Sequence, residues 1–135
     1  YAERLGRVDY WRQFADVDIA LDPFPYSGGA TTCETLWMGV PLVTLAGDYG
    51  FSRSGVTILA NTGMHRLIAR SADEYLRLAR GLACDLEGLR RLRLSLRQRM
   101  LASPLLDAPA YVQALEEGYR QIWRRWCSQR GQAHA

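Results

Sequence analysis

The segment "DVDIALDPFPYSGGATTCETLWMGVPLVTLAG", residues 16–47, carries the pattern from which the fold can be predicted. Its first part alternates and is β-branched, with Val17, Ile19 and Leu21 on one side of an extended chain. This alternation is typical of a β-strand. Asp22 and Pro23 then interrupt the pattern, so the predicted strand ends there.

A glycine-containing loop follows, and the sequence next predicts a helix from about Thr31 to Met38. Gly39 stands where a helix C-cap favours glycine, and Pro41 cannot continue the helix. The stretch "PLVTLAG", residues 41–47, is a second short apolar strand. The quoted segment is therefore predicted to be a strand–loop–helix–strand unit.

The flanking sequence continues this alternation and then becomes helical. A capping box marks one helix start, because Ser71 is followed by Glu74 three residues later. The remaining expected elements are a short helix over 3–15, a helix over 52–60, a third strand over 67–69, and helices over 86–101 and 109–126.

Strands that alternate with helices imply a parallel sheet. Because only about three strands are expected, the predicted fold class is α/β, a partial doubly wound parallel sheet of the Rossmann type followed by several C-terminal helices. The 135 residues are expected to form a single domain, 1–135. The chain opens without an initiator methionine, and we expect a fragment of a longer chain.

Composition narrows the class of protein. The chain is 48% hydrophobic and 23% charged, with a net charge of +3. It has no block of five or six like charges, so the sequence gives little support to nucleic-acid binding. Its three cysteines are widely spaced, which argues against a disulfide framework or a zinc site. No run of 18 apolar residues or signal sequence is present, so a cytoplasmic protein without membrane contact is expected.

The loop before the first helix of the quoted segment has the composition of a phosphate-binding turn. Gly28 and Gly29 allow the backbone to approach a ligand closely and permit positive φ. The amides of Ala30, Thr31 and Thr32 are the unpaired donors of the first helical turn, and they suit a phosphate or diphosphate. The two threonine hydroxyls can each add a hydrogen bond.

Glu34 lies one turn into the same helix. Its carboxylate can accept hydrogen bonds from ribose hydroxyls but would be a poor neighbour for phosphate. A plain alternative remains open, because two glycines before a helix are often only a tight turn, with Ser27 or Thr31 as an N-cap. The motif is neither GxGxxG nor a P-loop.

Other residues have both a functional and a structural interpretation. Arg53 can reach a phosphate or lie at the solvated surface, and Asp22 can orient the glycine loop or simply end the strand. Cys33 is expected to be a small buried apolar residue. The arginine-rich stretch "RRLRLSLRQR", residues 90–99, also leaves an arginine-rich helical adaptor as an alternative from another class.

The segment 22–47 resembles the nucleotide-binding stretch of the O-linked N-acetylglucosamine transferases, and more closely that of the SPINDLY-type protein O-fucosyltransferases and their bacterial relatives. Further matches are "RLIARSADEYLRLA" (66–79), "LRLSLRQRMLASPLLD" (92–107) and "ALEEGYRQIWRRWC" (114–127). The resemblance implies the C-terminal nucleotide-sugar-binding lobe of a GT-B glycosyltransferase. Its implied partners are a UDP- or GDP-linked sugar donor, a protein acceptor with Ser or Thr, and an N-terminal catalytic lobe with helical repeats.

The resemblance also implies roles for single residues. Thr31 and Thr32 would contact the diphosphate, Glu34 the ribose hydroxyls, and Gly28 and Gly29 the phosphates through close backbone approach. Tyr10 falls where relatives have His or Tyr near the base and phosphates, and Arg7 where a basic residue can occur.

Two departures from the family pattern bear on the donor. The N-acetylglucosamine enzymes usually have His where this chain has Gly29 or Ala30, and they have Asp where it has Glu34. Both departures favour the fucosyl type and leave uridine and guanosine open. The family's diphosphate-binding lysine lies upstream, so the catalytic residues remain unassigned and the isolated chain is expected to be inactive. No metal and no separate cofactor is implied. A non-catalytic nucleotide-binding or protein-interaction domain of the same fold is the alternative.

Overall fold

The computed structural model describes residues 6–132, and it divides into two compact units at Ser103 and Pro104. The predicted helix over 3–15 begins in part outside the described residues. The first unit contains, in order, α1 Arg7–Arg12, η1 Gln13–Asp16, β1 Ala20–Leu21, α2 Ala30–Trp37, β2 Leu42–Leu45, η2 Gly50–Ser52, α3 Ser54–Asn61, η3 His65–Leu67, β3 Ile68–Ala69, α4 Ala72–Cys84 and α5 Leu86–Leu101. The second unit contains η4 Pro104–Leu106 and α6 Ala108–Gln132.

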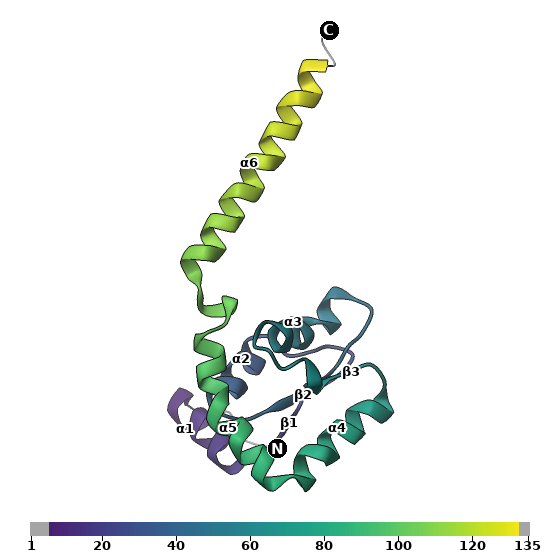
Figure 1. Cartoon of the computed structure of the whole chain (residues 1–135), viewed down its shortest axis with the longest axis vertical. Helices are drawn as coiled ribbons and strands as arrows, with labels where there is room; N and C mark the ends of the chain where they lie inside the picture. The colour runs from purple at the N-terminus through teal and green to yellow at the C-terminus, as the bar shows by residue number, and fades with distance from the viewer. Residues whose placement is uncertain (1–5, 133–135) are drawn as a thin grey trace. The chain divides into compact units, whose positions relative to one another are not determined.

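The three described strands form one parallel sheet in the order β1-β2-β3 (Figure 1). Ala20 pairs with Leu42 and Thr44 pairs with Ile68, so β2 is the central strand. Each strand is followed by a helix, which is the βαβ arrangement that the sequence predicts. The partial α/β sheet followed by helices is confirmed.

Alternate residues of β2 face two different apolar clusters, because successive side chains of a strand point to opposite faces of the sheet. Leu42 belongs to the larger cluster, which α2, α3 and α5 cover, and Val43 belongs to a smaller one covered by α4. The larger cluster comprises Leu36, Leu42, Ile58, Leu59, Met64, Leu67, Leu92, Leu96 and Met100.

The strand β1 is shorter than the sequence predicts, and its buried side is not the one with the aliphatic residues. Ala20 packs against the larger cluster and Asp22 is buried, whereas Leu21 is 56% exposed. The physical reason is that β1 lies at an edge of the sheet. Leu21 is on the same face as its pairing partner Val43, and the helix that covers this face, α4, contacts mainly β2 and β3.

Helix boundaries differ from the predicted ones by a few residues. Helix α2 is followed by Gly39 with φ of +82°, the left-handed conformation expected of a glycine that stops a helix. The helix expected from Ser52 begins at Ser54, because a 3₁₀ turn occupies 50–52. Ser71 caps α4 by accepting a hydrogen bond from the Glu74 amide, but the Glu74 carboxylate accepts from the Arg70 amide.

The arginine-rich stretch 90–99 lies on α5, and two of its arginines hold the unit together. Arg93 donates to the carbonyl of Val17 at 2.6 Å and so ties α5 to the segment before β1. Arg97 donates to the Trp37 carbonyl at 3.2 Å, and its guanidinium lies 5.0 Å from the Trp37 ring centroid. These arginines therefore have structural contacts within the unit, which an adaptor helix would not require.

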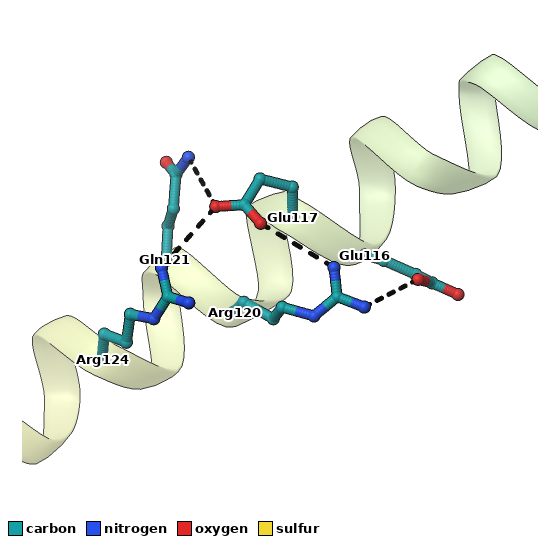
Figure 2. A network of polar contacts seen from close by, with 5 residues as sticks. All are labelled: Glu116, Glu117, Arg120, Gln121 and Arg124. Carbon is teal, nitrogen blue, oxygen red and sulfur yellow. Dashed lines mark hydrogen bonds and ion pairs between the residues drawn. The ribbon is translucent and has the colours of Figure 1, made fainter.

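The second unit is dominated by α6, a 25-residue helix longer than the predicted 109–126. One side carries a polar network in which Arg120 bridges Glu116 and Glu117, and Glu117 also contacts Gln121 and Arg124 (Figure 2). Its large apolar residues are exposed; they are Tyr111, Val112, Leu115, Tyr119, Ile122, Trp123 and Trp126. Among the described residues, no helix combines the length and apolar character needed to cross a membrane.

Candidate functional site

The glycine-containing loop lies at the carboxyl end of β1 and leads into α2. This edge of a parallel sheet is where ligands bind in open α/β folds. Gly29 is the N-cap residue of α2, no side chain caps the helix, and no acidic residue lies in its first turn. The first amides of α2 are thus not satisfied by a side-chain cap, and the first turn itself contributes no carboxylate to the positive end of the helix dipole.

Asp22 holds this loop in place through hydrogen bonds. The side chain is buried, at 1% exposure, and its Oδ1 accepts a hydrogen bond from the Gly28 amide at 2.8 Å. Its Oδ2 accepts from the Thr44 hydroxyl at 2.6 Å, and its backbone carbonyl accepts from the Tyr75 hydroxyl at 2.8 Å. Asp22 therefore orients the glycine loop and does not merely end the strand.

Gly28 packs closely against its neighbours, and neither glycine of the loop adopts the positive φ that the residue type permits. The glycines with positive φ among the described residues are Gly39 and Gly63. A Cβ at Gly28 would lie 2.6 Å from the Thr32 Oγ1 and 3.2 Å from the Asp22 Oδ1, whereas one at Gly29 would meet nothing within 4 Å. Only Gly28 is therefore required for close approach within the protein itself.

Ser27 joins this loop to the one that follows β2. Its amide and its hydroxyl both donate to the Phe51 carbonyl, at 3.2 and 3.1 Å, and its Oγ accepts from the Ser54 amide at 3.0 Å. Arg53 donates to the Gly47 carbonyl at 2.8 Å, which closes the second loop on itself. The Arg53 guanidinium thus has a structural contact at this edge of the sheet.

The two threonines of the predicted site differ in exposure. Ala30 and Thr31 are exposed at the start of α2, whereas Thr32 is buried. The Thr32 hydroxyl faces the loop at Gly28. A ligand over the helix N-terminus would therefore meet the Thr31 hydroxyl, and the contribution of Thr32 would come from its amide.

Tyr10 and Glu34, predicted separately, are brought together by the fold. The Tyr10 hydroxyl donates to the Glu34 Oε2 at 3.1 Å across 24 residues of sequence. Burial raises the pKa of the Tyr10 phenol, and the hydrogen bond to Glu34 and its charge raise it further. Burial and then the Glu34 charge likewise raise the pKa of the Cys33 thiol, which fits an apolar packing role. The side chain of Arg7 lies outside the described residues.

The model for "Glycosyl transferase family 41" matches residues 7–115. The chain belongs to this family. The matched range includes the glycine loop, α2, Tyr10 and the whole of the described sheet. Family 41 membership confirms the resemblance that the sequence motifs indicate.

Family 41 relatives from several organisms share this segment. The chain is 47% identical over 119 residues to a "Probable UDP-N-acetylglucosamine--peptide N-acetylglucosaminyltransferase SPINDLY" of Petunia hybrida, covering 88% of this chain and 13% of the relative. It is 43% identical over 123 residues to the protein of the same name in Arabidopsis thaliana, covering 91% and 14%. The chain thus spans about an eighth of the length of these relatives.

A solved structure has the same fold. It is a mutant of the O-GlcNAc transferase of Thermobaculum terrenum, which superposes with a TM-score of 0.87 at 38% identity and covers 95% of this chain and 25% of that one. The fold of the family 41 segment is therefore that of the matching quarter of this transferase.

Sequence reasoning missed one feature of this edge of the family 41 segment. Tyr26, Phe51 and Tyr49 form a parallel stack, with centroids 5.8 and 5.5 Å apart, contributed by the loops after β1 and β2. All three rings are exposed. The sequence signal that could have indicated this stack is the presence of three aromatic residues in the loops that follow two strands. Binding residues are often found on such loops.

Proposed function

We propose that residues 1–135 form a single domain that belongs to the C-terminal, nucleotide-sugar-binding lobe of a protein O-glycosyltransferase. The enzyme would transfer N-acetylglucosamine or fucose from a UDP- or GDP-linked donor to Ser or Thr of a protein. The observation that carries this proposal is the start of α2, which has no side-chain cap and lies at the carboxyl edge of the sheet behind a loop held by Asp22. Family 41 membership supports it.

The diphosphate of the donor would bind over the first turn of α2. Amides at Ala30, Thr31 and Thr32 would donate to its oxygens, and the helix dipole would stabilise its charge. Gly28 and Gly29 present no side chain that would shield this turn. The same interactions strengthen as the sugar departs and negative charge accumulates on the leaving diphosphate.

Glu34 and Tyr10 would bind the ribose. The Glu34 carboxylate can accept from two vicinal hydroxyls, and the Tyr10 hydroxyl already orients it at 3.1 Å. A ribose hydroxyl bound there would replace or share this hydrogen bond. Tyr10 would thus position Glu34 and close the site on the side of α1.

The described segment offers the leaving diphosphate a helix dipole but no lysine. All 17 basic residues counted as Lys or Arg are arginines, and Arg53 donates to the Gly47 carbonyl. The cation for the leaving group and the acceptor platform would come from the remainder of a longer protein. This chain alone is proposed to bind nucleotide without transferring sugar.

Calorimetry with UDP and with GDP tests the proposal on this chain. We expect one of the two to bind, and Glu34→Gln to weaken binding about tenfold through the loss of a charged acceptor. Glu87→Gln, which changes an exposed glutamate on α5, is the matched control and should leave binding unchanged. If neither nucleotide binds at millimolar concentration, or if both variants bind alike, the donor site is refuted.

A non-catalytic nucleotide-binding or interaction domain of the same fold remains the second candidate. The two candidates separate in a protein that carries this segment together with its remaining lobe. Nucleotide binding with no sugar transfer to a protein acceptor would favour the second candidate.

A further inference from the structure

A groove of about 590 Å³ runs between α4, α5 and η3. Its volume lies in the range of small-molecule sites. Gly81 on α4 widens it, because a Cβ there would meet nothing within 4 Å. Its lining includes Arg66, Arg77, Gly81, Asp85, Arg91 and Arg99, together with leucines of η3, α4 and α5.

The lining combines leucines with a cationic rim. Four arginines stand against one acid, Asp85, whose Oδ1 already accepts from the Gly88 amide as the cap of α5. Arg77 and Arg91 pair with glutamates of their own helices, Glu74 and Glu87. Leu67, Leu89 and Leu92 are buried core residues, whereas Leu78 and Leu82 are partly exposed. The groove therefore carries an excess of positive charge beside a small apolar surface.

Two of the four arginines are available for an external anion. Across the part of the chain that the structure describes, neither Arg66 nor Arg99 has a carboxylate within ion-pair distance. Arg99 donates through Nε to the Ser95 hydroxyl at 3.1 Å. Among the described residues, its terminal nitrogens have no hydrogen-bond partner. Both arginines line the same groove from different elements, η3 and α5.

This groove is separate from the glycine loop. Its η3 residues, Arg66 and Leu67, precede β3 and thus lie at the amino end of that strand. The glycine loop follows β1 at its carboxyl end, and in a parallel sheet these ends form opposite edges. A ligand of the groove would therefore bind independently of a nucleotide at α2.

We propose that the groove between α4 and α5 binds a small organic anion with an apolar body. Leu78 and Leu82, which are partly exposed, would contact the apolar body. Arg66 and Arg99 would bind its carboxylate, sulfonate or phosphate through charge-assisted hydrogen bonds. The neighbouring pairs Arg77–Glu74 and Arg91–Glu87 would remain intact at the rim. This function goes beyond donor binding, since it uses neither the glycine loop nor Glu34.

Two related dyes test the charge and the apolar part separately. The probe is 8-anilinonaphthalene-1-sulfonate, and its uncharged counterpart is N-phenyl-1-naphthylamine. In a ¹H–¹⁵N titration of the whole chain, we expect the sulfonate dye to shift the Gly81 and Gly88 amides. Shifts confined to α6, or no shift at all, would overturn the proposal.

Variants then assign the parts of the groove. The double variant Arg66→Gln/Arg99→Gln should weaken the sulfonate dye at Gly81 about tenfold or more and leave the uncharged dye unchanged. Arg80→Gln/Arg90→Gln removes the same charge outside this groove and is the matched control. Gly81→Leu should block both dyes while improving the helix propensity of α4. Equal weakening by both double variants would show a general charge effect and would overturn the site.

Discussion

Helices α5 and α6 have similar compositions but are stabilised in different ways. Both are long and combine arginines with large apolar residues. Four apolar residues of α5, Leu89, Leu92, Leu96 and Met100, are buried, whereas none is buried over 108–129, the part of α6 whose side chains are described. The comparison teaches that an amphipathic pattern predicts a helix but not the surface that covers it.

The largest expected effect on the free energy of unfolding comes from the buried face of α5. Leu96 is fully buried, so Leu96→Ala should lower the free energy of unfolding by about 3 kcal/mol through lost burial and a residual cavity. Trp123→Ala on α6 removes a larger but exposed side chain and should change it by less than about 0.5 kcal/mol. Urea denaturation measures both. A comparable loss from Trp123→Ala would break the contrast between the helices.

Two helical glycines sharpen the comparison at the level of packing. A Cβ at Gly55 would overlap the Asp22 carboxylate and lie 2.5 Å from the Thr44 hydroxyl, so Gly55→Ala should destabilise the first unit by about 2 kcal/mol. Gly118 in α6 has open space at that position, and Gly118→Ala should raise helix stability by roughly 0.5–1 kcal/mol. Thermal unfolding followed by circular dichroism measures both, and a stabilising Gly55→Ala would contradict the packing at Asp22.

A buried and an exposed tyrosine should differ in their effect on alkaline stability. Burial, and then the charge of Asp22, raise the pKa of the Tyr75 phenol above its ordinary value of 10.0. A raised folded pKa gives stability that is complete below about pH 10 and is lost as the pH rises through the folded value.

Tyr75→Phe should therefore cost about 1 kcal/mol at neutral pH, through the lost hydrogen bond to the Asp22 carbonyl, and should flatten the fall above pH 10. Urea midpoints from pH 8 to 11 measure this effect. Tyr111→Phe on α6 is the control, since its ring is exposed. An unchanged alkaline slope in Tyr75→Phe would assign the loss to other groups.

The smallest effect is expected in the polar network of α6. Glu117 contacts Arg120 and Arg124 at 3.8 Å, and these side chains are about half exposed or more. Glu117→Gln should reduce helix stability by about 0.3–0.5 kcal/mol at low salt and by less at high salt, since exposed pairs are weak and screened. Ellipticity at 222 nm in low and high sodium chloride measures the change, and a salt-independent effect would contradict an electrostatic origin.

Much of the fold could be predicted from local pattern. The alternation before Asp22, the leucine spacing of α5 and the glycine at position 39 each reflect a periodicity or a backbone preference that neighbouring residues determine. The length of β1 could not be predicted in this way. Its end depends on where β2 continues to pair with it, and its exposed face depends on where α4 lies.

The residues of the candidate site remain a prediction, and their orientation could not be predicted from the sequence. The types Gly, Thr and Glu after a strand predict a phosphate and ribose site. That Thr32 is buried while Thr31 is exposed depends on packing against Gly28. The hydrogen bond between Tyr10 and Glu34 joins residues 24 apart, so no local pattern could indicate it. The nucleotide contacts themselves remain a prediction.

The sequence by itself determined the order of strands and helices, the glycine loop after β1 and the family to which the chain is similar, because these depend on short-range pattern and residue type. Only the tertiary structure decided that Asp22 holds Gly28, Thr44 and Tyr75 together, that two arginines of α5 are structural, and that a charged groove lies at the opposite edge of the sheet. The reason is that these contacts join residues up to 76 positions apart, and the path of the chain through the parallel sheet brings them together.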